Sequence, residues 1–539
     1  MKGSVPLTPQ EALRHHEKIY NELLFTGNHP YVYPWAAGGA VVVLIYLMLD
    51  HRHSPTLKLL RYPIFAFLVA FQGYCMIYTR AISPAGAFGI GLVSSFGVLW
   101  TAAIMIFNDC QNDFKRIEQR FRPEVAGAEL RANGAAPDRD TSSHDTENGM
   151  RHRKPDQART TSTTDPLSQN GRLFWQSYPD QLSLERADWI ADVFCSFRGV
   201  GWNWQTNGVP PAPKWVEGQL HGEPDARTAD EPIGLSRTGI RRYSDWRLLL
   251  RHTAQDIIIG YIALDLLTTL MHRDPYFWTG DIHLPAPTYL PAAFQQSFIL
   301  VKCYRLLFSL AGVFVALRTI FKLGPALFCG VVGPRWIGLR GEPWMNPADM
   351  YGDFSLVLDK GLAGWWGGWW HQTFRFAFEA PTTRLLEACK VEKRSALGKG
   401  LSLFVAFFIS GIFHASGSFT QLPPTRPLSG PFAFFMLQAV GILAQTYAEA
   451  TLRHLKISQK TPQLLKRATN LVVVFTWLYF TAPLLVDDFA RGGVWLFEPV
   501  PFSPLRAFGL GAPEDMFFSW RDQIRWHTGK GWWDSGLAL

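Results

Sequence analysis

The sequence has 539 residues, which is enough for two or three soluble domains or for one large membrane-embedded body. Its formal net charge of +8 could suit nucleic acid, but Lys and Arg lie mainly in loops beside apolar blocks and form no nucleic-acid motif. A membrane surface explains that placement better, and the 21 Trp and 39 Phe residues suit long interfacial belts. We therefore expect membrane lipid as a partner and no nucleic acid.

Cysteine usage and the N-terminus narrow the class further. The six cysteines are scattered without the spacing of a disulfide framework or a zinc site, so we expect neither a disulfide framework nor a bound metal. The stretch MKGSVPLTPQEALRHHEKIY is polar, so we expect no cleavable signal peptide, and the first apolar run must direct membrane insertion.

Eight apolar runs approach the roughly 20 residues that a helix needs to cross the hydrocarbon core. They cover residues 33–49, 62–79, 86–107, 254–271, 294–317, 401–415, 431–452 and 470–486. The run 401–415 is the shortest. A further run, GPALFCGVVG at 324–333, is too brief and Gly-rich to cross alone, which predicts a re-entrant or interfacial piece. The fold class expected is an all-α, polytopic membrane helix bundle of about eight transmembrane helices.

Basic residues support this arrangement of spans. If the spans alternate in direction, one side receives the clusters Arg52, Lys58 and Arg61; Lys115, Arg116, Arg120 and Arg122; Arg318 and Lys322; Lys390, Lys393, Arg394 and Lys399; and Arg453, Lys456, Lys460, Lys466 and Arg467. An excess of Lys and Arg marks cytosolic loops. The N-terminus is then predicted to be lumenal and the long loops cytosolic, with the endoplasmic reticulum as the expected membrane.

The chain divides into three predicted parts, namely N-terminal transmembrane helices at 1–114, a largely disordered cytosolic loop at 115–185 and a second membrane domain at 186–539. Much of the loop is rich in Ser, Thr, Asp and Arg and poor in large apolar residues, so it cannot bury enough surface to offset chain entropy. After it, LERADWIADVFCSF predicts an amphipathic helix that lies on the cytosolic surface or packs against the bundle. Its apolar stripe is Trp189, Ile190, Val193 and Phe197.

Two histidines follow apolar or aromatic runs. His414 ends the run LFVAFFISGIFHASG, with Ser410 one helical turn earlier on the same face. Ionisable residues at membrane depth are costly and are functional candidates by default, although a helix-end histidine bonded at the interface is an equal alternative. In GWWGGWWHQTFR, His371 follows four tryptophans that alone would suit an interfacial belt. Two such histidines in consecutive elements favour a catalytic role over a structural one. A desolvated imidazole is neutral and can accept the proton of an alcohol.

At these segments the chain resembles a known family. The stretch EPWMNPADMYGDFSLVLDKGLAGWWGGWWHQTFRFAF, followed by SGIFHASG, is similar to the wax-synthase-like branch of the membrane-bound O-acyltransferase superfamily. The resemblance is closest to fungal enzymes that acetylate terpenoid and meroterpenoid natural products. It covers roughly residues 190–540, including FRGVGWNW and LLTTLMHRDPYF. The resemblance implies that 186–539 is a wax-synthase-like acyltransferase membrane domain.

The resemblance implies roles for individual residues. His414 would be the catalytic base, and His371 the second active-site residue, which is Asn in many relatives. Trp370, Gln372, Arg375 and Ser410 would bind substrate or co-substrate. The reaction implied is acyl transfer from acyl-CoA, with acetyl-CoA as the expected co-substrate and no permanently bound cofactor, to a hydroxyl of a hydrophobic alcohol. The predicted sidedness separates the two histidines, so the tryptophan segment must dip into the bilayer or the sixth span must be tilted or incomplete.

The sequence also allows other functions. The acceptor could be the precursor of a long-chain wax or a sterol ester, and a polytopic secondary transporter or a membrane scaffold is the alternative from another class. The stretch HTAQD at 252–256 matches the HxxxD pattern of soluble acyltransferases, but it sits at the mouth of a predicted span. The buried carboxylate predicted at Asp265 needs a partner, and a helix-packing contact is favoured. The sequence makes no prediction of oligomeric state.

Overall fold

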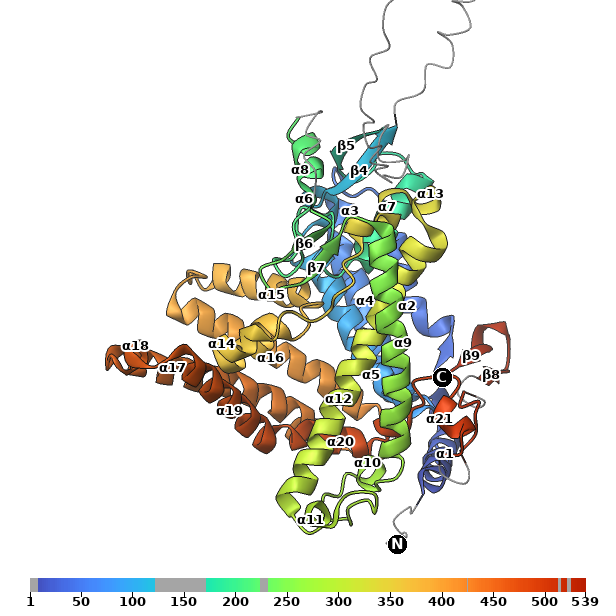
Figure 1. Cartoon of the computed structure of the whole chain (residues 1–539). Helices are drawn as coiled ribbons and strands as arrows, with labels where there is room; N and C mark the ends of the chain where they lie inside the picture. The colour runs from blue at the N-terminus through green and yellow to red at the C-terminus, as the bar shows by residue number, and fades with distance from the viewer. Residues whose placement is uncertain (1–7, 122–170, 223–230, 424, 512–514, 521–524) are drawn as a thin grey trace, which may run out of the picture.

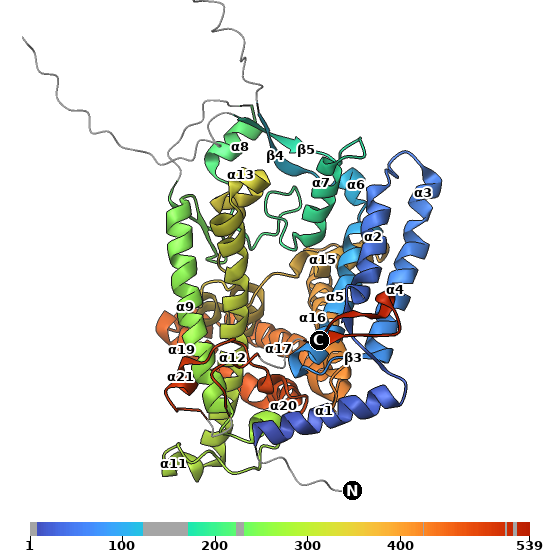
Figure 2. The same cartoon turned by 90° about the vertical axis from the view of Figure 1, so that its right-hand side faces the viewer.

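The fold is a bundle of long helices with a small polar cap. The computed structural model describes residues 8–121, 171–222, 231–423, 425–511, 515–520 and 525–539. Figure 2 shows α2 and α4 on one flank and α9 and α12 on the other, with α5, α15 and α16 between them. The cap, which contains α7, α8, β4 and β5, lies at the upper end in both views, whereas α1, α10 and α11 lie at the lower end (Figures 1 and 2).

The bounds of the elements are as follows. The helices before the cap are α1 (Pro9–Phe25), α2 (Gly38–Met48), α3 (Pro55–Leu59), α4 (Arg61–Tyr78), α5 (Pro84–Thr101) and α6 (Cys110–Asp113). They are followed by α7 (Leu184–Cys195), α8 (Lys214–Leu220), α9 (Trp246–Met271), α10 (Tyr276–Thr279), α11 (Ala292–Gln295), α12 (Phe298–Pro325), α13 (Pro334–Ile337), α14 (Ser355–Gly364) and α15 (Arg375–Ala388). The last are α16 (Ala396–Phe419), α17 (Ala433–His454), α18 (Ile457–Lys460), α19 (Gln463–Thr481), α20 (Pro483–Arg491) and α21 (Pro504–Ala507).

Short helical turns and strands complete the chain. The π-helical segments are η2 (Ala102–Ile106), η4 (Ala326–Val332), η7 (Trp365–Trp369) and η8 (Leu428–Phe432). The 3₁₀ turns are η1 (Trp35–Ala37), η5 (Gly338–Gly341), η6 (Pro343–Met345), η9 (Val494–Leu496) and η10 (Trp532–Asp534). The strands are β1 (His29–Pro30), β2 (Val32–Tyr33), β3 (Thr79–Arg80), β4 (Arg116–Phe121), β5 (Gly171–Gln176), β6 (Ile233–Leu235), β7 (Arg241–Tyr243), β8 (Arg525–His527) and β9 (Gly536–Ala538).

All eight apolar runs that the sequence singles out form helices. Six continuous helices in the described residues are long and apolar enough to cross a membrane, namely Pro55–Tyr78, Pro84–Ile106, Trp246–Met271, Phe298–Val332, Ala396–Phe419 and Leu428–His454. A seventh candidate is α19 followed by α20, which bend by 42° at their junction. The first run is a shorter apolar helix, Trp35–Met48. The predicted all-α membrane bundle is therefore confirmed, with six or seven full spans.

Two details of the spans were wrong. The sixth, expected at 401–415 as the shortest, is a 24-residue helix because Ser395 caps it before Ala396 and the helix continues to Phe419. The run 324–333 is no separate re-entrant piece, because α12 continues through Pro325 as the π-helical η4. A π-helical turn accommodates the missing Pro N–H. A Cβ at Gly330 would lie 3.1 Å from Leu250, so the glycine there permits close packing on α9.

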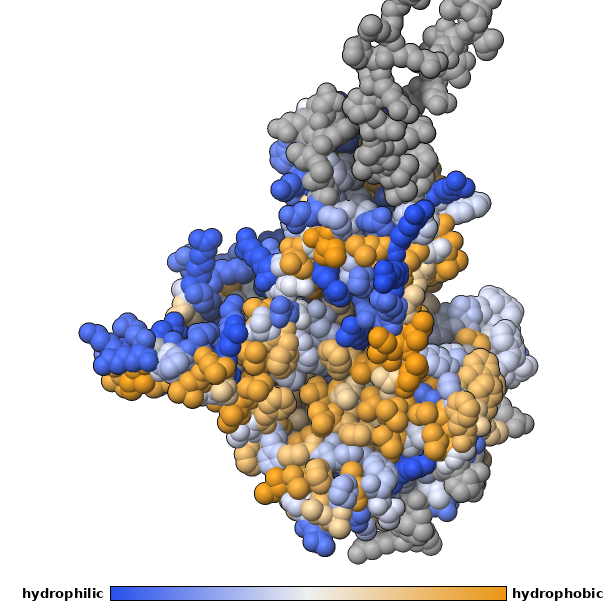
Figure 3. Space-filling model, in the orientation of Figure 1, coloured by the Kyte–Doolittle hydropathy of each residue, from blue (hydrophilic) through white to orange (hydrophobic). Residues whose placement is uncertain are grey.

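The outer surface suits hydrocarbon around the middle of the bundle. Four large apolar side chains of α9 are 47–66% exposed, namely Ile258, Ile259, Ile262 and Leu266. Figure 3 shows hydrophobic residues gathered over the middle of this face and hydrophilic residues above and along the upper left edge. Because such apolar patches are too large for a surface in water, they indicate contact with lipid.

The cap contains the amphipathic helix that the sequence predicts. In α7, Trp189, Ile190 and Val193 are buried, and Phe197 packs against the same cluster from the turn beyond the helix end. Strands β4 and β5 pair antiparallel, and Arg116 of β4 is buried against Asp188 (2.7 Å) and Asp192 (3.1 Å) of α7. The ends of the predicted loop 115–185 are thus structured, while residues 122–170 lie outside the described residues.

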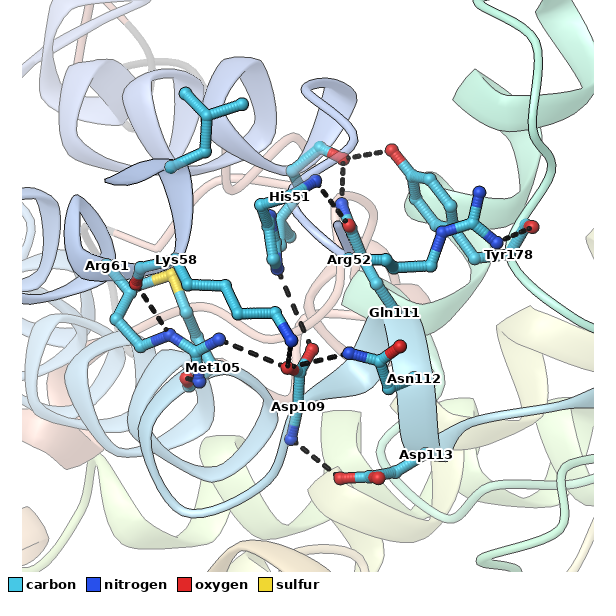
Figure 4. A network of polar contacts seen from close by, with 12 residues as sticks. His51, Arg52, Lys58, Arg61, Met105, Asp109, Gln111, Asn112, Asp113 and Tyr178 are labelled. Carbon is cyan, nitrogen blue, oxygen red and sulfur yellow. Dashed lines mark hydrogen bonds and ion pairs between the residues drawn. The ribbon is translucent and has the colours of Figure 1, made fainter. Parts of the chain in front are cut away.

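A network around Asp109 joins the cap end of three helices. Figure 4 shows Arg61 of α4 donating to the Asp109 carboxylate (3.1 Å), with Lys58 of α3 at 3.8 Å. His51, from the turn after α2, lies 3.7 Å from the other carboxylate oxygen. Gln111 donates to the carbonyls of Leu47 and Leu49. The basic residues predicted to follow the first span therefore hold the ends of α2, α4 and α5 together.

At the opposite end, a buried ion pair fixes α12 against the turn after α9. Arg305 and Asp274 are both fully buried and form a two-pronged contact, with Nε–Oδ2 and Nη2–Oδ1 distances of 2.9 Å. Arg305 also donates to the carbonyls of Ile282, Leu284 and Pro285. Asp274 belongs to the HRDPYF motif, so this part of the motif is structural.

The remaining acidic candidates also have structural partners. Asp265 accepts hydrogen bonds from the Ser503 hydroxyl (2.5 Å) and the Leu505 backbone N–H (3.0 Å), which is the packing contact the sequence favours. Asp256 of HTAQD pairs with Lys322 (2.6 Å) and Arg318 (2.8 Å) of α12. The HxxxD match is therefore a helix-pairing contact.

Replacing Arg305 by Met should lower the free energy of unfolding by about 3–5 kcal/mol, because Asp274 would remain buried without a partner. The measurement is the thermal midpoint of the purified protein in detergent, read from the loss of the monodisperse fluorescence peak. Arg335→Met, at an exposed residue of α13, is the matched control and should leave the midpoint unchanged. Equal midpoints for both variants would contradict a stabilising role of the pair.

Candidate active site

The tryptophan motif forms a tight turn between α14 and α15. Helix α14 passes into the π-helical η7, and the chain turns at Trp370–Phe374 before α15 begins. Gly361 has φ +55°, and a Cβ there would lie 2.0 Å from the Gln445 side chain. A Cβ at Gly364 would lie 1.9 Å from the Leu356 carbonyl oxygen. Gly361 is therefore needed for the backbone path and its packing on Gln445 of α17, and Gly364 for the close approach to Leu356 at the start of α14.

Two of the four tryptophans of this motif are buried inside the bundle, and the other two are partly buried. Trp365 and Trp369 are 3% and 9% exposed, which is too little for an interfacial belt. Trp366 packs edge-on against Phe407 of α16 and Phe435 of α17, at 5.6 and 5.9 Å. Trp366 thus lies between α16 and α17, and the dip of the tryptophan segment into the bilayer stays a prediction.

Gln372 and Arg375 stabilise the turn that carries His371. The Gln372 amide donates to the carbonyls of Trp366 (2.9 Å) and Trp370 (2.8 Å). Arg375 donates to the Gln372 side-chain oxygen and forms an ion pair with Glu379 at 2.8 Å. In the described residues, both of these predicted substrate ligands thus bind the chain itself, and their assignment to substrate stays a prediction.

His414 lies in α16 with one ring nitrogen engaged. Its Nδ1 is 2.9 Å from the Ser410 carbonyl oxygen. A carbonyl can only accept, so Nδ1 carries the proton and Nε2 is left with a lone pair. The ring packs on Phe435 with centroids 4.3 Å apart, and Phe88 of α5 lies at 6.5 Å. Ser410 therefore orients His414 through its backbone, and the side chain of His414 remains partly exposed.

The structure brings His371 and His414 to the same aromatic cluster. The His371 ring contacts Trp370 (5.5 Å) and Phe374 (5.6 Å). Phe374 in turn contacts Phe413, the neighbour of His414, at 6.4 Å. Burial and, to a smaller degree, the proximity of His414 lower the pKa of His371 to about 3. His371 is thus a neutral imidazole, and its side chain is also partly exposed.

Several residues of this region were missed by the sequence reasoning. Phe435 and Gln438 come from α17, and Gln438 is fully buried. Its Oε1 accepts from the Trp366 indole (3.3 Å), and its Nε2 donates to the hydroxyl of Thr481 (3.1 Å). The signal was a glutamine inside the apolar run FFMLQAVGIL. Among the residues that the structure describes, no group of three or more His, Cys, Asp or Glu is placed to hold a metal ion.

Comparison with known proteins gives a family match for the segment that holds both histidines. Residues 347–437, which contain the tryptophan motif, His371 and His414, match the model of the membrane bound O-acyl transferase family. The chain is an O-acyltransferase enzyme. With its six or seven apolar spans, the O-acyltransferase is an integral membrane protein.

Relatives extend the similarity of the acyltransferase beyond this segment. It is 24% identical to acetyltransferase pyr8 of Aspergillus fumigatus, over 65% of this chain and 75% of the relative. It is 25% identical to acetyltransferase eriL of Hericium erinaceus, over 60% and 72%. It is 23% identical to O-mevalon transferase yanI of Aspergillus niger, over 55% and 60%. No solved structure matches the acyltransferase significantly.

The helix that carries His414 in the acyltransferase is held very close to α5. A Cβ at Gly91 of α5 would lie 1.9 Å from the Ser416 carbonyl oxygen, two residues after His414. One turn further, the Thr420 hydroxyl donates to the Ala87 carbonyl (2.7 Å) and accepts from the Gly91 N–H (3.1 Å). Small residues at such crossings allow helix backbones to approach in membranes.

Replacing Gly91 by Ala should separate α5 from α16 and move His414, because the Ser416 carbonyl belongs to the backbone and cannot rotate away. We expect a loss of about 1–3 kcal/mol in stability and a clear loss of acyl transfer. The thermal midpoint in detergent and the specific activity of microsomes measure these effects. Gly97→Ala is the control, because it lies on the same helix and no atom is within 4 Å of the added Cβ. It should leave the thermal midpoint and the specific activity unchanged. Wild-type behaviour of both variants would contradict the close approach.

Proposed function

We propose that this acyltransferase moves an acyl group from acyl-CoA to a hydroxyl of a hydrophobic, terpenoid-type secondary metabolite, with acetyl-CoA as the donor. The observation that carries the proposal is the His414 imidazole, whose Nδ1–H binds the Ser410 carbonyl and leaves Nε2 unprotonated at the aromatic cluster that also contains His371. Acetyltransferases among the relatives favour a short acyl group. The apolar spans favour a lipid-soluble acceptor, and the endoplasmic reticulum is the membrane we propose.

In the proposed reaction, His414 Nε2 accepts the proton of the alcohol while the alcohol oxygen attacks the thioester carbonyl carbon. The oxyanion collapses, the C–S bond breaks, and coenzyme A leaves as a thiolate that recovers the proton from His414. His371, held neutral by burial, donates a hydrogen bond to the thioester or the oxyanion. The surrounding Trp366, Phe374 and Phe435 rings exclude water, which would otherwise hydrolyse the thioester.

Replacing His414 by Ala should reduce ester formation by about 10²–10⁴-fold, because the proposed general base is removed. The assay uses microsomes, labelled acetyl-CoA and a panel of hydroxylated terpenoids, with long-chain acyl-CoA and sterols as rival substrates. His454→Ala, at the exposed end of α17, is the control. Unchanged transfer by the His414 variant would refute the base. Uptake of substrate down a gradient without ester formation would favour a transporter, and esters formed only from long-chain donors would favour wax or sterol ester synthesis.

Replacing His371 by Asn should retain more activity than replacement by Ala, since an amide keeps a hydrogen-bond donor at this position. Because the pKa of His371 is about 3, the residue does not titrate above about pH 5. The acid limb of kcat/KM between about pH 5 and 8 should therefore be the same in wild type and His371→Asn. An acid limb that disappears in the Asn variant would show that His371 is the titrating group.

A further inference from the structure

Tyr351 lies on a segment that is fixed by charge on one side and by the tryptophan motif on the other. Two residues earlier, Asp349 accepts from Arg241 Nε (2.6 Å) and Lys322 Nζ (3.3 Å). Arg198 donates to the Asp349 carbonyl at 3.0 Å. One residue later, the Gly352 N–H donates to the Trp369 carbonyl at 2.9 Å. The backbone of Tyr351 therefore has little freedom.

The Tyr351 ring lies against the last indoles of the motif. Its centroid is 5.4 Å from Trp370 and 5.6 Å from Trp369, and Phe314 of α12 lies at 4.4 Å. Trp370 has His371 as its neighbour on the chain, with ring centroids 5.5 Å apart. Tyr351 and His371 thus contact the same indole.

The hydroxyl of Tyr351 is buried and has no hydrogen-bond partner among the residues that the structure describes. The same holds for Nδ1 of His371. Two other buried tyrosine hydroxyls have partners, since Tyr178 donates to the Leu47 carbonyl (2.8 Å) and Tyr276 to Asp487 (2.6 Å). The buried hydroxyl of Tyr243, in a different cluster, has no partner among the described residues. An unmade hydrogen bond of a buried hydroxyl is costly, so two of them around Trp370 indicate that a ligand supplies the partner.

The chemistry of the hydroxyl restricts that partner. Burial raises the pKa of Tyr351, so the phenol stays protonated and can donate. The segment that carries Tyr351 is attached through the Asp349–Lys322 ion pair to the cap end of α12. The distribution of basic residues predicts that this end of the bundle faces the cytosol. Acyl-CoA is a polar, cytosolic molecule, whereas a hydrophobic alcohol partitions into the membrane. The partner on this side is therefore the acyl donor.

We propose that the Tyr351 hydroxyl donates a hydrogen bond to the carbonyl oxygen of the acyl thioester. This inference rests on the proposed acyl transfer. The phenol keeps its proton throughout, and the bond strengthens as negative charge develops on the oxygen. Tyr351 thereby polarises the carbonyl from the donor side, and His414 acts on the alcohol.

The test is Tyr351→Phe, which removes the hydroxyl and keeps the ring packing. Tyr243→Phe is the matched control, because its hydroxyl is also buried without a partner among the described residues but belongs to a different cluster, with Leu249 and Ala348. In the microsomal assay, kcat/KM for acyl-CoA should fall about 10²-fold for Tyr351→Phe, the order found for single oxyanion donors. The KM for the alcohol and the thermal midpoint should not change. The control should equal wild type in all three quantities.

A second measurement does not depend on turnover. S-acetonyl-CoA, which keeps the carbonyl but cannot transfer an acyl group, should raise the thermal midpoint of wild type and Tyr243→Phe more than CoA does. For Tyr351→Phe the two ligands should give equal shifts. Wild-type kinetics of Tyr351→Phe, equal losses in both variants, or a loss confined to the KM for the alcohol would overturn the inference alone. Absence of ester formation by the wild type on the whole panel would overturn the proposed function, and the inference with it.

Discussion

The constraint on which this structure depends is that a polar group inside a bundle surrounded by hydrocarbon must find its hydrogen-bond partner within the protein. Most polar side chains named above obey it. Gln438 joins the Trp366 indole to Thr481, and Asp265 holds Ser503 and the start of α21. Arg305 uses its whole guanidinium on Asp274 and three carbonyls. These contacts set the relative positions of helices that hydrophobic packing alone would leave free to slide.

The same constraint separates structural polar residues from candidate functional ones. The sequence presents Asp265, Asp256, His371 and His414 alike, as ionisable groups near or within apolar runs. In the structure, the two carboxylates are saturated by neighbouring segments, whereas each histidine keeps a ring nitrogen without a partner among the described residues and part of its surface accessible. Those histidines lie where α16, α17 and the tryptophan turn meet, and the family match covers the same segment.

Hydropathy was sufficient to predict the helices, because the thickness of the membrane sets the length of a span and each span therefore requires a long apolar run in the sequence. It failed at 324–333, where a π-helical turn extends α12 beyond Pro325, and at the start of α16, where the Ser395 cap begins the helix at Ala396. Both errors concern backbone geometry, which composition does not record. The fold class was therefore predictable, and several helix limits were not.

For the site, the two histidines could be selected from the sequence, but their neighbours could not. Phe435 and Tyr351 come from elements that hydropathy treats as ordinary apolar helix and loop, and only the folded chain brings them to His414 and Trp370. The burial of the tryptophans was also unpredictable, because an interfacial belt and a bundle interior have the same composition. In the structure, Gly361 packs on Gln445 of α17, and Trp365 and Trp369 are buried beside it.

The pairing of β4 with β5 has a consequence for the long insertion in the cap. Phe121 lies opposite Gly171, so the two residues that flank positions 122–170 occupy adjacent places in one strand ladder. The entropy of closing a loop between fixed ends grows only with the logarithm of its length. Evolution can therefore lengthen, shorten or rewrite the insertion with little effect on the membrane bundle, and the same point is a natural place to graft a reporter domain.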